Sequence, residues 1–460
     1  MSDFKKSSFT VLGAGRSGIA AAKLLKRNGA EVFLSDGSDK DKLKFLDEEV
    51  LRKEGIEYEI GVHSDRIYES DIFIKSPGIP PENQVIQNAV KLNKKIYSEI
   101  EMAYRFCKSP VIAITGTNGK TTTTVLTGEI FKNAGNDTKV CGNVGLAFSE
   151  VLSDTDENSI VILEVSSYQL EDTEEFRPRV SVLMNITPDH IDWHGSFDNY
   201  LKAKIKITKN QTGDDLAVIN YDDEILRSSL KGTPVRKAYF SIRENLIEKN
   251  DSSIETGSYT DNGKIIYFDK AKNIAEEIME TREINIRGNH NLYNSLAAVI
   301  SARSFEIKKE IIRDTLKSFQ GVEHRIEFVR ELDGVSYYND SKATNIDSLI
   351  VAIESFEKNI ILILGGREKG NDYSAVDKLV RERVKEIFAV GEAREKIYDH
   401  FNNRIKVTMV SSFEEAVISA RESGRRGDIV LLSPACKSFD MFESFEHRGK
   451  EFKRIVNLLK

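Results

Sequence analysis

The chain has 460 residues, 40% hydrophobic and 30% charged, a composition typical of a globular protein with about three domains of roughly 150 residues each. A net charge of −7 excludes a general attraction to nucleic acid, and three widely spaced cysteines exclude a disulfide framework or a zinc cluster. The N-terminus has no signal-peptide core, and no apolar run approaches the ~20 residues that span a bilayer. We therefore predict a cytoplasmic protein with no membrane insertion.

The N-terminal part has the pattern of a dinucleotide-binding βαβ unit. A predicted strand at residues 9–12 runs into the glycine loop of residues 13–18 (GAGRSG), a helix follows at 19–28, and a second strand at 31–36 ends in Asp36. The glycines allow the backbone to approach a pyrophosphate, and Asp36 can accept a hydrogen bond from a hydroxyl or a base. The pattern suits NAD, FAD or a UDP-sugar, and a glycine-rich turn without a ligand is the alternative.

A strand at residues 72–76 and a stiff turn at 77–81 (PGIPP) follow, and we expect the first domain to end near Ser98. A turn near residues 319–322 predicts the second boundary. The predicted domains are therefore residues 1–98, 99–321 and 322–460.

The second domain opens with a phosphate-binding pattern. Residues 111–114 predict a buried strand, residues 115–121 (TGTNGKT) a tight loop, and the apolar spacing from Thr122 onward a helix. Backbone N–H groups at such a helix start bind phosphate, Lys120 would reach the terminal phosphates, and the Thr121 hydroxyl would join Mg²⁺. The general pattern has a glycine where this chain has Ile114, and an ordinary Gly-Lys turn is the alternative.

Two further stretches of this domain carry candidate ligands. Glu164 lies at the end of a predicted buried strand, which suits a magnesium ligand, although a salt-bridged glutamate is the structural alternative. Residues 188–195 (PDHIDWHG) follow another strand and lack the spacing of a zinc helix. His190 in this stretch can ligate a second Mg²⁺ or orient a carboxylate.

The rest of the second domain is less specific. A predicted helix at residues 200–209 carries four lysines, which by themselves indicate a solvated basic face, and a hairpin is expected at residues 260–264. Asn291 and Asn294 lie three residues apart on a later helix. Paired amides suit an adenine or ribose edge, and helix capping is the alternative.

The third domain repeats a strand-and-loop pattern. After His324 and Arg325, a strand at residues 335–340 runs into the polar loop at 341–345 (SKATN). A strand at residues 360–364 is followed by a glycine loop with cations, and similar strands follow at 387–391 and 429–434. With helices between them, these strands predict a doubly wound α/β domain.

Seven motifs in this chain resemble those of the Mur ligase family, the ATP-dependent amide ligases of bacterial cell-wall synthesis: GAGRSG, SPG, TGTNGKTT, EVSSYQL, DHIDWHG, NDSKATN and SPACKSFD. The resemblance covers nearly the whole chain. TGTNGKTT is shared with folylpolyglutamate synthases, which lack an N-terminal domain of this kind. EVSSYQL is similar to the form in the ligase that adds D-glutamate, whereas the ligase for the third residue usually has histidine in place of Tyr168.

The resemblance implies three α/β domains: a Rossmann-like UDP-binding domain, a central P-loop-type ATPase domain with a mostly parallel sheet, and a C-terminal Rossmann-like domain. It implies that D-glutamate is joined to UDP-N-acetylmuramoyl-L-alanine through an acyl phosphate in peptidoglycan precursor synthesis, giving ADP and phosphate. The expected partners are these small molecules, without nucleic acid, and the expected state is a monomer.

The family's site residues map onto this sequence as follows. The UDP-substrate would contact Arg16, Ser17, Asp36, Gly78, Asn143 and Gln169. ATP would contact Gly116, Thr117, Asn118, Gly119, Lys120, Thr121, Thr122, Asn291, Asn294, Arg325 and Asp340. The amino acid would contact Lys342, Thr344, Lys369, Ser438 and Phe445.

Two Mg²⁺ ions would be held by Thr121, Glu164, His190 and Lys204, the last matching a lysine that the family converts to a carbamate with CO₂. The implied catalytic residues are Lys120, His190, Lys204 and Lys342. The other lysines of the basic helix, Lys202, Lys206 and Lys209, are then expected on the surface.

Other functions stay open at this point. Another Mur-type or folylpolyglutamate-type ligase would share the phosphate loop. An NAD-dependent oxidoreductase would use the first glycine loop and Asp36, but it leaves TGTNGKTT and DHIDWHG unexplained. A non-catalytic nucleotide-gated protein leaves the third domain's cationic loops without a role.

Overall fold

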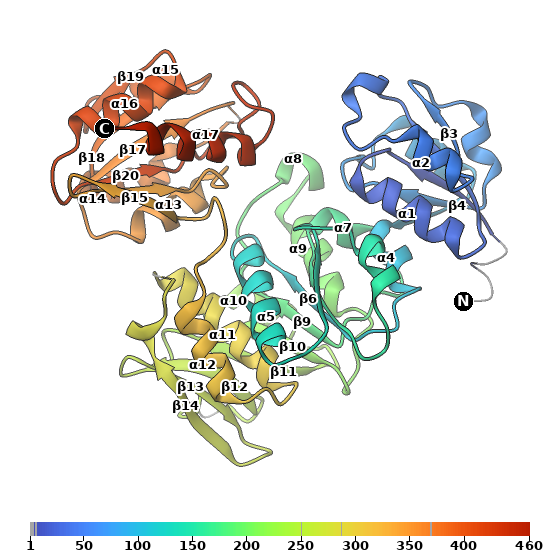
Figure 1. The fold of residues 1–460 in the computed structure, drawn as a ribbon. Helices are drawn as coiled ribbons and strands as arrows, with labels where there is room; N and C mark the ends of the chain where they lie inside the picture. Colours follow the sequence, from blue (N-terminus) through green and yellow to red (C-terminus); the bar gives the residue numbers. More distant parts are fainter. Residues whose placement is uncertain (1–3, 5–6, 250, 287, 369) are drawn as a thin grey trace. The chain divides into compact units, whose positions relative to one another are not determined.

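The computed structural model describes residue 4 and residues 7–249, 251–286, 288–368 and 370–460 (Figure 1). Its helices and strands form three α/β domains with mostly parallel sheets, as predicted. The chain divides into two compact units, one of Met1–Asn285 with Leu292–Phe319 and one of Ile286–Asn291 with Gln320–Lys460. The first unit contains two of the three sheets.

The N-terminal sheet is parallel and has the strand order β3-β2-β1-β4-β5, which matches the first five positions of the Rossmann order 3-2-1-4-5-6. Its strands are β1 (Ser8–Leu12), β2 (Glu31–Asp36), β3 (Glu57–Ile60), β4 (Ile72–Lys75) and β5 (Lys95–Ser98). The helices are α1 (Arg16–Arg27), α2 (Glu48–Lys53), α3 (Gln84–Lys91) and α4 (Glu99–Tyr104). The predicted strand at 31–36 is confirmed, and α1 begins three residues before the predicted helix, inside the glycine loop.

The central sheet has nine strands in the order β14-β13-β12-β11-β10-β9-β6-β8-β7. Strands β6 to β12 are parallel, and β13 is antiparallel to both of its neighbours. The strands are β6 (Val111–Thr115), β7 (Thr138–Gly142), β8 (Ile160–Glu164), β9 (Val180–Leu183), β10 (Leu216–Asn220), β11 (Arg236–Ser241), β12 (Thr256–Asp261), β13 (Lys264–Asp269) and β14 (Ile274–Glu280).

The helices of the central part are α5 (Lys120–Asn133), α6 (Phe148–Val151), α7 (Ser167–Glu171), α8 (Ile191–His194), α9 (Phe197–Ile205), α10 (Glu224–Ser229), α11 (Asn289–Arg303) and α12 (Lys309–Ser318). Strands β6 and β8 bury every residue, which explains their continuous apolar sequences. The predicted hairpin joins β12 to β13. Asn262 and Gly263 both have positive φ there, as a tight hairpin turn requires.

The C-terminal sheet has the order β15-β16-β20-β17-β18-β19, with only the pair β15 and β16 antiparallel among these strands. The strands are β15 (Glu327–Leu332), β16 (Val335–Asn339), β17 (Ile360–Gly365), β18 (Val384–Val390), β19 (Lys406–Met409) and β20 (Ile429–Leu432). The helices are α13 (Ile346–Glu354), α14 (Asp377–Arg383), α15 (Arg394–Phe401), α16 (Phe413–Ser423) and α17 (Phe445–Leu458). The predicted doubly wound α/β pattern is confirmed.

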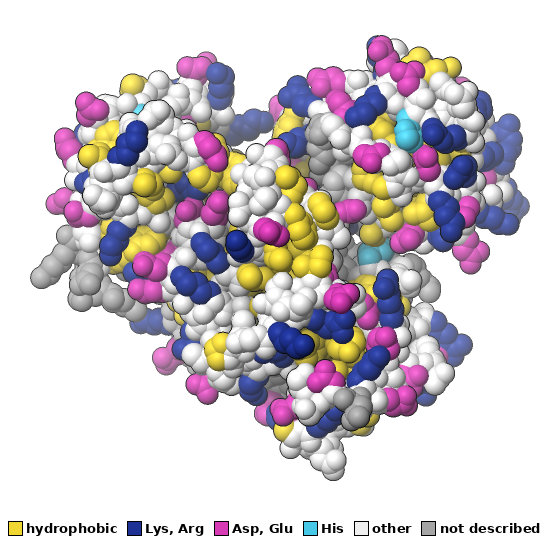
Figure 2. All heavy atoms as spheres, turned by 180° about the vertical axis from the view of Figure 1, so that it is seen from behind, with side chains coloured by type: hydrophobic (Ala, Val, Ile, Leu, Met, Phe, Trp, Pro, Cys, Tyr) yellow, Lys and Arg dark blue, Asp and Glu magenta, His cyan; other side chains and the backbone are white. Residues whose placement is uncertain are grey.

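The distribution of charge and the composition of the helices complete the description of the fold. On the face shown in Figure 2, basic and acidic side chains of the described residues lie close to one another over the whole face. Among the helices that the structure describes, none combines the length and apolarity needed to cross a membrane.

Candidate active site

The loop between β6 and α5 is shaped by two glycines. Gly119 has φ +84° and immediately precedes Lys120, the first residue of α5. A Cβ on Gly119 would lie 2.6 Å from Asn294 Oδ1, and a Cβ on Gly116 would lie 2.8 Å from Met184 Cβ. Both positions therefore require glycine. The left-handed Gly119 ends the loop, so the helix begins at Lys120, two residues earlier than predicted.

The same loop is braced from the segment that follows β9. The Asn118 N–H donates to Asn185 Oδ1 at 2.8 Å, and Asn185 Nδ2 donates back to the Asn118 carbonyl at 3.0 Å. The Thr117 hydroxyl donates to the Thr187 carbonyl at 3.1 Å and lies 2.9 Å from the Tyr200 hydroxyl. These bonds fix the backbone of the loop, so its N–H groups have a set direction.

Two lysine side chains converge on this loop. The Lys120 ammonium donates to the carbonyls of Gly116 and Thr117, both at 2.9 Å, and the Lys204 amine donates to the Gly116 carbonyl at 2.8 Å. Lys204 is only 2% exposed. Its burial, and secondarily the charge of Lys120, lower the pKa of Lys204 well below its ordinary value. The site therefore favours a neutral amine at Lys204.

The other lysines of the basic helix divide into two kinds. Lys202 and Lys209 are exposed, as expected. Lys206 is half-buried and donates to the Glu171 carbonyl, so its expected surface position is wrong. It lies in the turn that follows α9, close enough to the end of α7 for its long side chain to reach that carbonyl.

Glu164 ends β8 and is 1% exposed. Its Oε1 accepts a hydrogen bond from Asn143 Nδ2 at 2.7 Å, while Oε2 is buried without a hydrogen-bond partner among the described residues. A buried carboxylate oxygen without a hydrogen-bond partner lowers the stability of the fold unless a cation or a hydrogen-bond donor binds it. Gln169 has a nearby structural task, since its Oε1 accepts from the Ser166 N–H and hydroxyl in a capping box that starts α7.

His190 lies on the DHIDWHG segment, which forms the short helix α8. His190 itself has φ +55° and immediately precedes that helix. Its Nε2 lies 3.5 Å from Asp189 Oδ2, and its ring centroid lies 4.9 Å from that of Tyr168. The imidazole is 42% exposed, so its edge is accessible to a ligand.

A cavity of about 550 Å³ lies at the carboxyl ends of the N-terminal strands, and Ser17, Asp36 and Gly78 are among its lining residues. The two Asp36 oxygens accept from the Ala14 N–H at 2.7 Å and the Ser38 N–H at 2.8 Å. Asp36 therefore shapes the glycine loop and its own turn. The Arg16 guanidinium donates elsewhere, to the Gly145 carbonyl.

The second unit contains most of the remaining predicted site residues, whereas Asn294 belongs to the first unit. Asp340 follows β16, and its oxygens accept from the Ser433 hydroxyl at 2.9 Å and the Ile326 N–H at 3.3 Å. Burial raises the pKa of Asp340 to about 7, and the neighbouring Arg325 opposes that rise. Of the predicted asparagines, Asn291 lies in the first turn of α11, and Asn294 is buried and accepts from the Thr123 hydroxyl at 3.1 Å.

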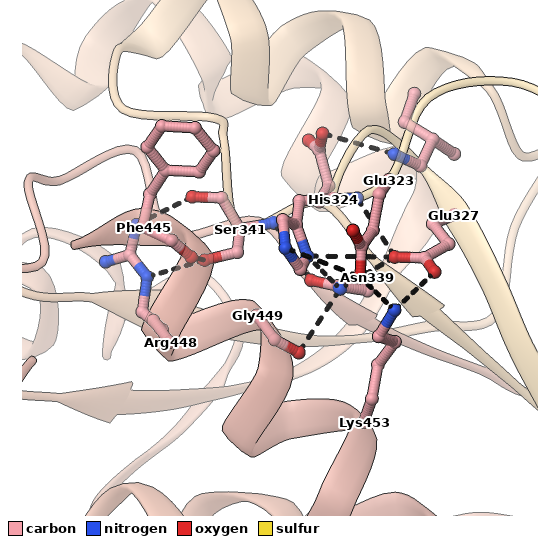
Figure 3. A network of polar contacts seen from close by, with 11 residues as sticks. Glu323, His324, Glu327, Asn339, Ser341, Phe445, Arg448, Gly449 and Lys453 are labelled. Carbon is pink, nitrogen blue, oxygen red and sulfur yellow. Dashed lines mark hydrogen bonds and ion pairs between the residues drawn. The ribbon is translucent and has the colours of Figure 1, made fainter. Parts of the chain in front are cut away.

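The loop that carries Lys342 is anchored by a residue that sequence reasoning missed. Arg448 is fully buried, and it donates to the hydroxyl and carbonyl of Ser341 at 2.9 and 2.8 Å and to the Cys436 carbonyl at 3.2 Å. Figure 3 shows Arg448 beside Ser341 and Phe445. The Lys342 ammonium lies 5.4 Å from the Phe445 ring centroid, and Ser438 is buried on the segment after Cys436. Thr344 is half-buried on the same loop as Lys342, and Lys369 lies outside the described residues.

Comparison with known proteins decides the family. Family models match three successive stretches: the MurD N-terminal domain at residues 8–85, the Mur ligase middle domain at 114–302 and the Mur ligase glutamate ligase domain at 324–436. The UDP-N-acetylmuramoylalanine–D-glutamate ligase of Chloroherpeton thalassium is 43% identical over 471 aligned residues, which cover 99% of this chain and 98% of that protein. The chain belongs to the Mur ligase family. The ligase of the same name from Clostridioides difficile is 40% identical over the full length of both chains.

Solved structures of Mur ligases share the fold. A UDP-N-acetylmuramate-alanine ligase (MurC) from Thermotoga maritima matches with a TM-score of 0.61 at 20% identity and covers 98% of this chain and 99% of its own. A MurF ligase from the same organism, solved in complex with ADP, matches with a TM-score of 0.57 at 16% identity and covers 99% of both chains. The predicted family and the three-domain α/β fold are both confirmed.

One further cluster of this Mur ligase has the composition of a metal site. Within the described part of the chain, Glu323, His324 and Glu327 are the single group of three such side chains whose ligand atoms lie within 4.8 Å of one another (Figure 3). The Lys453 ammonium lies 2.5 Å from Glu323 Oε1 and 2.8 Å from Glu327 Oε1, and Asn339 Nδ2 lies 2.9 Å from His324 Nδ1. Lys453 already supplies the positive charge, so we assign this cluster to holding the backbone beside Arg325.

Proposed function

We propose that this Mur ligase joins D-glutamate to UDP-N-acetylmuramoyl-L-alanine and converts ATP to ADP and phosphate. The observation that carries the proposal is the similarity along the whole chain: relatives with that printed activity are 40% to 43% identical, from one end of the chain to the other. A folylpolyglutamate-type ligase does not account for the N-terminal domain. An NAD-dependent oxidoreductase does not account for the phosphate loop.

The chemistry explains why ATP is needed. A carboxylate resists attack by an amine because its oxygen is a poor leaving group. Transfer of the γ-phosphoryl group from ATP to the substrate carboxylate gives an acyl phosphate and ADP. The D-glutamate amine then attacks the acyl carbon, and the tetrahedral intermediate expels phosphate as the amide forms. The protein's tasks are to position the reactants and to neutralise charge.

The phosphate loop suits the first of these tasks. Its glycines bring backbone N–H groups close to the start of α5, where the helix dipole favours phosphate, and Lys120 lies across the loop. We assign the ATP phosphates to this loop, and the rest of the nucleotide to the side chains of Asn291, Asn294, Arg325 and Asp340.

The residues around Glu164 fit Mg²⁺. The buried Oε2 lacks a hydrogen-bond partner among the described residues, and Asn143 orients the carboxylate through its other oxygen. We propose that Glu164, His190, Thr121 and a carbamate on Lys204 hold two ions. Bound Mg²⁺ neutralises phosphate charge during transfer. The carbamate is supported by the burial of Lys204 and by its lowered pKa, since only the neutral amine reacts with CO₂.

We place the domain boundaries after Ser98 and after Gly321. Strand β5 ends at Ser98, and the second unit resumes at Gln320. We propose that the enzyme acts as a cytoplasmic monomer, because one chain carries the residues assigned to all three substrates and these are nucleotides and an amino acid.

The N-terminal cavity gives the first prediction. Asp36→Ala should weaken the binding of UDP-N-acetylmuramoyl-L-alanine by about tenfold or more, because it removes an acceptor and releases the Ala14 and Ser38 N–H groups. The affinity for ATP should stay close to that of the wild type. Isothermal titration calorimetry measures both, and Asp39→Ala, an exposed acid in the following turn, is the matched control. Saturable binding of NADH by the wild type would contradict the UDP assignment.

The loop that carries Lys342 gives the second prediction. D-Glutamate carries two carboxylates, and Lys342 is a cation beside Phe445, so Lys342→Ala should raise the amino-acid KM by about tenfold or more. The KM for ATP should change less. Steady-state kinetics compare the variant with Lys378→Ala, an exposed lysine on α14. An unchanged amino-acid KM would mean that the pocket lies elsewhere; Lys369→Ala tests the second predicted cation.

The test of the function itself is phosphate release. The purified protein is given ATP, Mg²⁺ and UDP-N-acetylmuramoyl-L-alanine with each member of a panel of amino acids. We expect release with D-glutamate, well above that with L-glutamate, D-aspartate or meso-diaminopimelate. Release without any UDP-substrate, or release with a folate in its place, would contradict the proposal.

A further inference from the structure

A buried ion pair joins the N-terminal sheet to the central part of the chain. The Lys75 ammonium lies 2.6 Å from Asp172 Oδ2, and the Lys75 side chain is only 2% exposed. Lys75 is the last residue of β4, whereas Asp172 directly follows α7. The family resemblance gives neither residue a role.

Two neighbouring strands hold this aspartate. Lys75 of β4 pairs in register with Ser98, the last residue of β5. The Ser98 N–H donates to the Asp172 carbonyl at 3.0 Å, while Lys75 reaches the carboxylate of the same residue. Asp172 Oδ2 is buried and receives no hydrogen bond from the other described residues, so Lys75 compensates its charge. The end of α7 is therefore held to β4 and β5 at two points.

Each partner of the pair adjoins a segment to which we assign the UDP-substrate. Lys75 is followed directly by residues 76–79, which line the N-terminal cavity. Asp172 directly follows the short helix α7, which contains Gln169, the second segment of that assignment. A shift of α7 relative to β4 would therefore separate two walls of the same substrate site.

The burial of two charges indicates that this pair serves geometry more than stability. A buried ion pair loses the hydration of both groups, and apolar side chains of similar volume often stabilise a fold equally well. A charged pair, however, has one preferred arrangement, whereas apolar side chains can repack. The N–H groups of residues 174–176 donate to the Glu101 carboxylate of α4, but these bonds do not reach β4. Lys75 thus links the end of α7 directly to the strand that carries the cavity turn.

We infer that Lys75 and Asp172 are positioning residues, whose ion pair holds the nucleotide end and the reacting end of the UDP-substrate site in register. This inference rests on the proposed UDP-substrate. A ligand that spans both parts gains affinity from a fixed arrangement, because the two parts need no ordering when it binds. A ligand that touches the N-terminal cavity alone gains nothing from that arrangement. The pair should therefore affect the whole substrate and UDP differently.

The experiment compares the binding of UDP-N-acetylmuramoyl-L-alanine and of UDP to the full-length protein by isothermal titration calorimetry. Lys75→Met keeps much of the length of the side chain but removes its charge. It should bind the whole substrate about tenfold more weakly than the wild type, and UDP within about twofold. The matched control is Lys264→Met, which breaks an exposed ion pair with Glu277 between β13 and β14 and should change neither affinity.

A second variant keeps the test independent of the stability of the fold. Lys75→Met leaves the Asp172 carboxylate buried without its cation, which lowers the free energy of unfolding. Lys75→Met/Asp172→Leu removes both charges, so its unfolding temperature should lie close to that of the wild type. It should still bind the whole substrate about tenfold more weakly, because the tie between β4 and α7 is lost.

Three results would overturn the inference. Whole-substrate affinity close to that of the wild type in both variants would leave the pair a structural contact. An equal loss of affinity for UDP and the whole substrate would mean that the pair acts on the cavity alone. A loss that the double variant restores would trace the effect to the unpaired carboxylate. Failure of the proposed function looks different: the wild type itself would bind the whole substrate no more tightly than UDP and would release no phosphate with it.

Discussion

Lys204→Ala should reduce turnover by at least about 100-fold, a loss of roughly 2.7 kcal/mol in transition-state stabilisation. A protonated lysine at this position would set a positive charge beside the proposed Mg²⁺ ions, which is the wrong sign. Burial and the charge of Lys120 favour the neutral amine, and its reaction with CO₂ gives an anionic carbamate. Alanine removes that anion, so a short carboxylic acid in the buffer should restore part of the rate.

The controls come from the same helix region. Lys202→Ala and Lys209→Ala, both exposed, should keep near-normal turnover. A readout besides activity is ¹³C NMR of the protein under ¹³CO₂, where a carbamate signal should be present in the wild type and absent from Lys204→Ala. Full activity of Lys204→Ala in CO₂-free buffer would exclude the carbamate and leave Lys204 as a buried structural lysine.

Much of the fold follows from local sequence patterns. The continuous apolar runs of β6, β8 and β17 predict buried parallel strands, and all three bury every residue. The glycine loops after β1 and β6 mark where helices begin. The predicted starts of the helices are less accurate than the predicted strands. A left-handed glycine such as Gly119 decides where the loop ends, and its φ cannot be read from the sequence.

The candidate site was predictable only where a motif carries it. The phosphate loop, Glu164 and the residues after β16 lie on short motifs with recognisable order. Helical periodicity does not distinguish Lys204 from the other three lysines of this segment. Lys204 differs from them in being only 2% exposed, and this burial depends on how α9 packs. Asn185 and Arg448 hold their loops through bonds to residues 67 and 107 positions away in the chain, and no local signal marks such partners.

Lys120→Ala should also reduce turnover by at least about 100-fold, because its ammonium lies across the loop to which we assign the ATP phosphates. The free energy of unfolding should change little, since Lys120 is part-buried and its bonds go to carbonyls of its own loop. Lys132→Ala, exposed in the last turn of α5, is the matched control. Turnover and thermal unfolding measure the two effects separately.

The two lysines are coupled, which gives Lys120→Ala a second consequence. Removing Lys120 removes one cause of the lowered pKa of Lys204, but burial is the larger cause and remains. The carbamate signal of Lys204 should therefore persist in Lys120→Ala while turnover is lost, and the added carboxylic acid should not rescue it. Rescue by the acid would mean that Lys120 acts through Lys204, and near-normal turnover would remove the ATP phosphates from this loop.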